Sequence, residues 1–351
     1  MRKSLPGTFA TITGAVLLLS AAASPSRAAD DAAWASPLSA MMAPGALMPK
    51  TPAGPTASKP ASQAAHTQML LMKGIQLVGG GKKASFGIEA VPQLQYYGGP
   101  MLSNVKIQVV YWNDAVANQD KLPGFFAAIT QSPYFDWLKE YNTPSATLGR
   151  GALLGAYTDS VQNPSGQIED ADIRTELTSL LSKNAVPQAD ANTLYMVYFP
   201  PGLNIDFGGS GSCQVFCAYH NTFMNNGTEI NYGVIPDQGG SCAGGCGGDP
   251  DTFNNETSVS SHEMIESVTD PAVGLVTGNE PVAPLGWYDA ANGEIGDICN
   301  GVQGKVGAYT VQREWSNSRG LCVTSAQDSG TPASPSVASK TGDSGSIGSQ
   351  P

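Results

Sequence analysis

The sequence predicts an α+β fold, held together by disulfides, in a protein that is exported from the cell. Three observations lead to this prediction. Segments with strand-like and helix-like apolar patterns interleave without a regular strand–helix–strand rhythm, which disfavours a doubly wound parallel fold. The six cysteines are an even number and lie in the later part of the chain, as in many disulfide-linked exported domains. The N-terminus has the pattern of a secretory signal.

Composition divides the chain into four parts. Arg2 and Lys3 precede an apolar run from Phe9 to Ala23 and a small-residue segment, the pattern of a cleaved signal. The segments on either side of the central region are rich in small and polar residues and lack periodicity, so they cannot bury enough apolar surface to fold. We predict a signal peptide, a largely disordered linker or pro-segment, a single domain and a disordered tail over residues 1–29, 30–93, 94–324 and 325–351.

Net charge and hydropathy limit the partners and the location. The formal net charge is −11 at pH 7, with only 18 Lys and Arg residues. Nucleic acids and anionic membranes require a basic surface, so neither is expected as a partner. No segment after the signal reaches about 18 consecutive apolar residues, the length that spans a bilayer. We therefore expect a secreted or periplasmic protein.

The central region alternates strand and helix segments. Strands are predicted where apolar and β-branched residues cluster, over Asn104–Trp112, 192–200 and 228–236. Helical turns are predicted over 122–141, with a break near Ser132 and Pro133. A longer helix is predicted over 170–186, where apolar residues recur at helical spacing.

The segment DTFNNETSVSSHEMIESVTDP, from Asp251 to Pro271, predicts a helix of about four turns. Asn254, Asn255 and Thr257 are its candidate N-caps, and Pro271 stops it because proline cannot continue a helix.

Two potential metal ligands lie one turn apart on this helix. His262 and Glu266 are four residues apart, so both side chains emerge on one face within reach of one ion. Glu263 lies beside them, where its carboxylate can accept a proton from water. The pattern is that of H-E-x-x-H zinc hydrolases, with glutamate in place of the second histidine. The alternative is an ordinary amphipathic helix that carries a histidine and glutamates.

The stretch HEMIESVTDPAVGL, followed by NGEIGDICNG, resembles the active-site helix and third-ligand segment of thermolysin-like metallopeptidases. The resemblance covers some forty residues and implies a zincin-like domain, with the active-site helix beside a mixed sheet. It implies His262 and Glu266 as the first two zinc ligands, Glu263 as the general base and Glu294 as the third ligand. Asp297 would then orient the histidine.

The chain departs from that pattern in two places. The second histidine is absent, and an insertion containing LGWYDAANG precedes Glu294. A carboxylate in place of imidazole makes the site harder, so Mn²⁺ and Ca²⁺ become alternatives to Zn²⁺. If NGEIGDICNG is a strand, Glu294 and Asp297 point to opposite faces and only one can meet the ion. Asp289 is then a rival third ligand.

A second resemblance covers residues 94–324. The stretches YYGGPMLSNVKIQVVYW, CAYH, CAGGC and LCVT are similar, in this order, to the phosphate-induced protein 1 or EXORDIUM-like family of secreted proteins. This resemblance implies one extracellular domain and leaves catalysis open. It also draws attention to His220, three residues after Cys217, as a further ligand, a hydrogen-bond donor to a developing oxyanion, or a structural histidine.

Several other residues are candidates for stabilising roles. Tyr288 and Tyr309 are the hydroxyl donors that can assist catalysis, although buried tyrosines more often serve packing. The cysteines allow fifteen disulfide pairings. We favour Cys213 with Cys217, Cys242 with Cys246, and Cys299 with Cys322; a thiolate zinc site at the two C-x3-C pairs is the alternative.

The sequence therefore predicts an exported zinc peptidase that acts on a peptide or protein substrate. The alternative is a non-catalytic extracellular protein of the EXORDIUM-like type, which binds carbohydrate or cell-wall polysaccharide and can carry a structural ion.

Overall fold

The computed structural model describes residues 69–71, 91–161, 166–272 and 284–333, all of which belong to the unit Pro60–Pro351. The described residues form a mixed α+β fold with several sheets and three disulfides. The predicted signal peptide, most of the predicted linker and the end of the predicted tail lie outside them. No described helix combines the length and the apolar character needed to cross a membrane.

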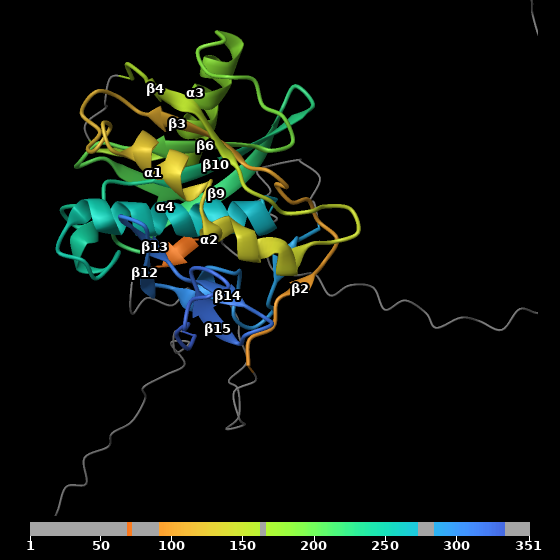
Figure 1. The fold of residues 1–351 in the computed structure, drawn as a ribbon. Coiled ribbons are helices and arrows are strands. Elements are labelled where there is room, and N and C mark those ends of the chain that lie inside the picture. The colour runs from red at the N-terminus through yellow and green to blue at the C-terminus, as the bar shows by residue number, and fades with distance from the viewer. Residues whose placement is uncertain (1–68, 72–90, 162–165, 273–283, 334–351) are drawn as a thin grey trace, which may run out of the picture. The chain divides into compact units, whose positions relative to one another are not determined.

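A six-stranded mixed sheet forms the centre of this fold (Figure 1). In spatial order its strands are β1 (Met69–Leu71), β9 (Phe216–Asn225), β10 (Thr228–Ile235), β6 (Thr193–Tyr198), β3 (Lys106–Tyr111) and β4 (Ala152–Thr158). The four strands β10, β6, β3 and β4 run parallel, and β9 is antiparallel to β10. Strands covered on both faces are nearly continuous apolar runs, as in β3 and β6. The predictions of β3, β6 and β10 are confirmed.

The three remaining strands, β1, β4 and β9, were not predicted. β9 joins β10 through Asn226 and Gly227, which both have positive φ, as two-residue hairpin loops require. β1 lies inside the predicted linker, 30–93, and its backbone pairs antiparallel with β9, Met69 opposite Tyr219 and Leu71 opposite Phe216. The linker therefore contributes a strand to the domain.

Helices cover both faces of the sheet. They are α1 (Leu122–Ile129), α2 (Pro133–Asp136), the 3-10 helix η1 (Trp137–Tyr141), α3 (Asp170–Ser182) and α4 (Thr252–Thr269). The break predicted near Ser132 and Pro133 separates α1 from α2, and Ser132 caps α2. On one face, Tyr219 and Tyr232 of the sheet donate hydrogen bonds to Asp170 of α3. On the other face α4 contacts β9, β10 and β6 (Figure 1).

Helix α4 is buried along nearly its whole length. Asp251 is its N-cap, because its carboxylate accepts from the backbone N–H of Phe253, so the predicted caps further along the chain were wrong. The helix ends at Thr269, next to Asp270 and Pro271, since a residue before proline avoids the helical conformation. The hydroxyls of Ser260, Ser267 and Thr269 donate to carbonyls of the preceding turn.

Removal of the cap should weaken this helix. We expect Asp251→Ala to lower the free energy of unfolding by about 1 kcal/mol, because a helix N–H loses its acceptor. Urea unfolding followed by circular dichroism measures the change. Asp251→Asn retains a capping oxygen and should remain close to the parent; an equal loss in both variants would contradict the capping role.

Small sheets lie on the far side of α4 from the main sheet (Figure 1). Their strands are β2 (Gln95–Tyr96), β11 (Trp287–Tyr288), β12 (Gln303–Val306), β13 (Tyr309–Gln312), β14 (Glu314–Ser316) and β15 (Leu321–Val323). A separate three-stranded sheet of β5 (Gln167–Glu169), β7 (Asn204–Phe207) and β8 (Ser210–Gly211) contacts α3 instead. β13 packs directly on α4. Cys322 pairs with Thr331, and Thr324 donates to Asp328, so the described fold continues beyond 324, where the tail was predicted to begin.

Two of the three predicted disulfide pairings were wrong. The bonds are Cys213–Cys242, Cys217–Cys246 and Cys299–Cys322. The start of β9 and the 3-10 helix η2 (Cys242–Gly244) lie side by side, so each cysteine faces one from the other segment rather than its neighbour in sequence. All six cysteines are bonded, which excludes the alternative thiolate zinc site.

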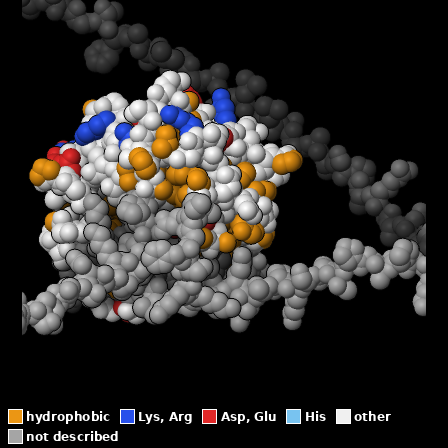
Figure 2. Space-filling view, turned by 90° about the horizontal axis from the view of Figure 1, so that it is seen from below, with side chains coloured by type: hydrophobic (Ala, Val, Ile, Leu, Met, Phe, Trp, Pro, Cys, Tyr) orange, Lys and Arg blue, Asp and Glu red, His pale blue; other side chains and the backbone are white. Residues whose placement is uncertain are grey.

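On the part of the face in Figure 2 that is not grey, hydrophobic side chains lie between polar ones, and lysine and arginine side chains lie along the upper rim. Scattered single apolar residues are normal for protein surfaces.

Candidate functional site

The H-E-x-x-E segment of α4 is buried against the sheet. His262 and Glu263 are 0% exposed, and Glu266 is 2% exposed. His262 Nε2 lies 3.0 Å from Glu266 Oε1, in an ion-pair contact rather than a well-formed hydrogen bond. The prediction that these two side chains share one helix face stands in the structure, and their neighbours are polar rather than aliphatic.

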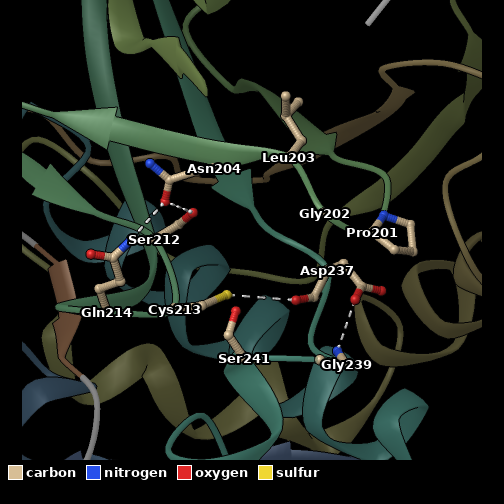
Figure 3. A pocket seen from close by; sticks show the side chains of 11 residues that line it. Pro201, Gly202, Leu203, Asn204, Ser212, Cys213, Gln214, Asp237, Gly239 and Ser241 are labelled. Atoms are coloured by element: carbon tan, nitrogen blue, oxygen red, sulfur yellow. Dashed lines mark hydrogen bonds between the residues drawn. The ribbon is translucent and has the colours of Figure 1, made fainter. Parts of the chain in front are cut away.

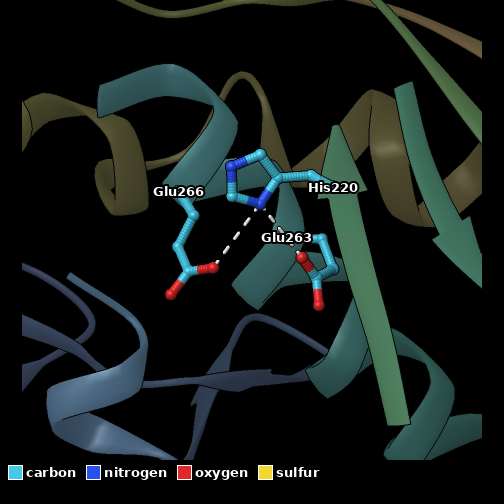
Figure 4. A group of neighbouring side chains, drawn as sticks. All are labelled: His220, Glu263 and Glu266. Carbon is cyan, nitrogen blue, oxygen red and sulfur yellow. Dashed lines mark hydrogen bonds and ion pairs between the residues drawn. The ribbon is translucent and has the colours of Figure 1, made fainter. Parts of the chain in front are cut away.

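Strand β9 brings a second histidine to the same place. His220 Nδ1 lies 3.2 Å from Glu263 Oε2 and 3.6 Å from Glu266 Oε2 (Figure 4). Its Nε2 lies 3.2 Å from the backbone carbonyl of Asp270 and 3.7 Å from Glu294 Oε1. His220 is therefore part of the site.

The predicted third-ligand segment is a turn and not a strand. Asp297–Cys299 forms the 3-10 helix η3, and Glu294 N donates to Asp297 Oδ2. Both carboxylates therefore lie at the cluster, because a turn does not force them to opposite faces. Asp297 N also donates to Glu266 Oε1 at 3.0 Å. Asp289 accepts bonds from the backbone of its own turn and from Gln93, away from these groups.

Three residues of the site were not predicted. Gln312 of β13 places its Nε2 2.6 Å from His262 Nδ1 and 2.9 Å from the carbonyl of Gly296. Asp270 and Glu314 add two more buried carboxyl groups. The Val-Thr-Asp that follows the helix motif was a signal for Asp270, whereas no local pattern marks Gln312 or Glu314.

Gly296 allows the turn to approach the helix. A Cβ atom at this position would lie 2.6 Å from His262 Nδ1 and 2.8 Å from Glu266 Oε1. The backbone of Gly296 has φ −82°, which any residue can adopt, so the requirement for glycine is purely one of space.

Gly296→Ala should consequently destabilise the protein by about 1–3 kcal/mol, because the added methyl group displaces side chains in a packed interior. Urea unfolding measures the effect. Gly244→Ala is the matched control, since a Cβ at Gly244 meets nothing within 4 Å. Equal stability of the two variants would show that the turn and the helix are not in close contact.

Burial raises the pKa of several carboxyl groups in the cluster. Burial and the neighbouring carboxylates raise the pKa of Glu294 well above its ordinary value, and burial raises the pKa of Glu263. Burial and Glu266 raise the pKa of Asp297 to about 7, and burial also raises that of Asp270 to about 7. Burial is the largest cause of each of these shifts, because it disfavours the charged form of a carboxyl group.

The pKa shifts of the two histidines and of Glu266 favour the charged form of each group. Burial alone would lower the pKa of His262, but Glu266 and Glu263 raise it well above its ordinary value. Burial alone would raise the pKa of Glu266, but the charge of His262 lowers it. Burial likewise disfavours the charged form of His220, and Glu263 outweighs this and raises its pKa. Positive charge at the histidines is therefore what stabilises the carboxylates.

In the described part of the chain, no lysine or arginine supplies positive charge to the cluster. The carboxylates that pair with Lys106, Arg150, Arg174 and Arg313 all lie outside it. Several buried atoms of the cluster have no hydrogen-bond partner among the described residues: His262 Nε2, Glu263 Oε1, Asp270 Oδ2, both carboxylate oxygens of Glu294, and Glu314 Oε2. Buried charges without partners are costly. These atoms therefore fit a bound cation.

The candidate ligand atoms fall into two groups in the described residues. His262, Glu266 and Asp297 form one group, and His220, Glu263 and Glu266 form the other; within each, the ligand atoms lie within 4.8 Å of one another. Glu294, expected as the third ligand, is in neither group, and its Oε1 lies 3.7 Å from His220 Nε2.

The two candidate tyrosines differ in position. Tyr288 is buried near the cluster, where burial and the charges of Asp297 and Glu294 raise its pKa. The ring of Tyr309 packs on Phe125 of α1 and serves the core. Tyr288 is therefore the one that remains a candidate.

A separate surface pocket of ≈ 260 Å³ lies between the start of β7 and the loop after β10 (Figure 3). Asn204, Gln214, Asp237 and Ser241 line it together with Cys213. Asp237 accepts from its own loop at Gly239, and none of the histidines or glutamates of the cluster is among its described lining residues.

Comparison of the chain with known protein families, with curated proteins and with solved structures gave no match.

Proposed function

We propose that the protein is an exported metal-dependent hydrolase, a zinc peptidase in which Glu263 is the general base. The observation that carries this proposal is the buried group of His262, Glu263 and Glu266 on one helix, beside unpartnered carboxylate oxygens and without lysine or arginine. Mn²⁺ and Ca²⁺ are the alternatives, because oxygen ligands outnumber nitrogen ligands.

His262 Nε2, Glu266 Oε1 and a carboxylate of the 294–297 turn would hold the ion. Asp297 has the better position for the third ligand, and Glu294 is the alternative. Two ligands of one tetrahedral zinc ion lie about 3.3 Å apart, since each lies about 2.0 Å from it. The observed 3.0 Å between His262 and Glu266 is close to this separation. Ligation through Nε2 would place the ring proton of His262 on Nδ1. Gln312 would then have to turn its amide oxygen toward Nδ1 and give up its hydrogen bonds to the carbonyl of Gly296 and from the N–H of Gly301.

A divalent ion held by these residues would supply Lewis acidity, which would lower the pKa of water and polarise a scissile carbonyl. Glu263 then accepts the proton of the attacking water at Oε1, the oxygen without a partner, and passes it to the leaving amine. Tyr288 is a candidate donor to the developing oxyanion.

A zincin-like arrangement fits this proposal, because α4 lies directly beside a mixed sheet and carries the H-E pair. The predicted pro-segment contributes β1, which pairs with Phe216, Ala218 and Tyr219 of β9, the strand that carries His220. The disulfides and the predicted signal support export.

A peptide-cleavage assay tests the proposal. The purified protein, before and after limited proteolysis of its N-terminal segment, is incubated with casein and with a peptide library. Cleavage should be abolished by a chelator and restored by Zn²⁺. Absence of cleavage in every form, with the ion still bound, would refute the hydrolase.

A second candidate is a non-catalytic extracellular protein of the EXORDIUM-like type that binds cell-wall polysaccharide and carries a structural ion. The complete burial of His262 and Glu263 favours it, because a structural site need not admit substrate. Retained metal, no cleavage and binding to insoluble polysaccharide would select this candidate.

A further inference from the structure

The carboxylate of Glu266 faces two different histidines. Its Oε1 lies 3.0 Å from His262 Nε2, and its Oε2 lies 3.6 Å from His220 Nδ1. The candidate ligand groups on the two sides share only this residue. Glu266 therefore has the position of a carboxylate that bridges two sites.

His220 has the hydrogen bonding of a metal-bound histidine. Its Nε2 lies 3.2 Å from the carbonyl of Asp270, which can only accept a hydrogen bond, so the ring proton belongs on Nε2. Nδ1 then carries a lone pair that faces the carboxylates of Glu263 and Glu266 (Figure 4). Ligating histidines usually donate their other N–H to a carbonyl or carboxylate in this way.

The cluster holds more potential ligands than one divalent cation needs. Its carboxyl groups are Glu263, Glu266, Asp270, Glu294, Asp297 and Glu314. A tetrahedral ion takes four ligands, and these groups together with the two histidines exceed that number. Glu263 Oε1 is fully buried and has no hydrogen-bond partner among the described residues, so the contact with His220 does not satisfy this carboxylate.

We propose that His220 Nδ1, Glu263 Oε2 and Glu266 Oε2 bind a second divalent cation, and that Glu266 bridges it to the ion held by His262. Zn²⁺ and Mn²⁺ both fit a mixed nitrogen and oxygen ligand set. The competing explanation is a doubly protonated His220 that pairs with Glu263 and needs no ion.

Metal stoichiometry tests the second site without reference to activity. The protein is dialysed against buffered Zn²⁺ and its metal content is determined by elemental analysis. We expect about two ions per chain, as in carboxylate-bridged sites, about one in His220→Gln and about one in His262→Gln. Glu266→Gln should lose most of both. His66→Gln, changed outside the described residues, is the control and should keep the parent content.

One ion in the parent that His220→Gln leaves in place would overturn the second site and leave the proposed hydrolase intact. Two ions without any peptide cleavage would support the second site and refute the hydrolase. If a variant fails to fold, the Mn²⁺-loaded parent decides: two ions bridged by one carboxylate give a spin-coupled electron paramagnetic resonance spectrum, whereas uncoupled Mn²⁺ would contradict the bridge.

A second ion bound at Glu263 should inhibit peptide cleavage. This expectation rests on the proposed function. A cation on Glu263 Oε2 makes that carboxylate a weaker base. Peptide cleavage should therefore rise as the first equivalent of Zn²⁺ binds and fall as the second binds. Cleavage that stays at its maximum through the second equivalent would contradict this assignment.

Discussion

Glu263→Gln should reduce kcat for peptide cleavage by about 100- to 10,000-fold, the usual contribution of a general base. Glutamine fills the same space in the buried site but cannot accept the proton of the attacking water. Steady-state kinetics on a cleaved peptide measure the effect. The ion held by His262 and Glu266 should persist, whereas the proposed second ion, which Glu263 also binds, should be lost.

Glu256→Gln is the matched control on the same helix. Burial raises the pKa of Glu256 to about 8, so at pH 7 this side chain is mostly protonated and glutamine resembles it. Glu256 contacts Asn118 and lies outside the two ligand groups. Its variant should retain the parent kcat within a few-fold. A comparably small effect of Glu263→Gln would remove Glu263 from the mechanism.

Loss of a disulfide before α4 should have a large effect on the free energy of unfolding. Cys217→Ala with Cys246→Ala should lower the free energy of unfolding by about 3 kcal/mol, because the unfolded chain gains the freedom that the crosslink removed. The bond spans 29 residues and joins β9, three residues before His220, to the segment before α4. Urea unfolding under non-reducing conditions measures the loss.

The neighbouring bond Cys213–Cys242 spans the same number of residues and limits the same loop. While either bond remains, the unfolded loop is still restricted, so removal of both should cost clearly more than removal of one. If the variant without both bonds were within about 1 kcal/mol of the parent, the crosslinks would not stabilise this part of the fold.

The main elements of the fold could be predicted because their sequence patterns are local. The apolar runs of β3 and β6 identify strands, and the break between α1 and α2 follows from Pro133. β9 was missed because it mixes aromatic residues with asparagine and histidine, although the Asn226–Gly227 hairpin signal was present. β1 is short and depends on a partner far along the chain, which no local pattern reveals.

The part of the candidate site on α4 could also be predicted from the sequence, since residues four apart share a helix face. The positions of His220, Gln312 and Glu314 depend on how β9, β13 and β14 pack around α4. Such packing brings together residues that are distant in sequence. The disulfide pairing was mispredicted for the same reason, because it is set by the contact of β9 with η2.

The central claim is that His262 and Glu266 share a divalent ion, and anomalous diffraction at the zinc absorption edge tests it most directly. Crystals of the zinc-loaded protein should show an anomalous peak about 2.0–2.2 Å from both His262 Nε2 and Glu266 Oε1. A map without such a peak, in which Nε2 donates a hydrogen bond to Glu266, would show that the pair is a buried ion pair and would contradict the account.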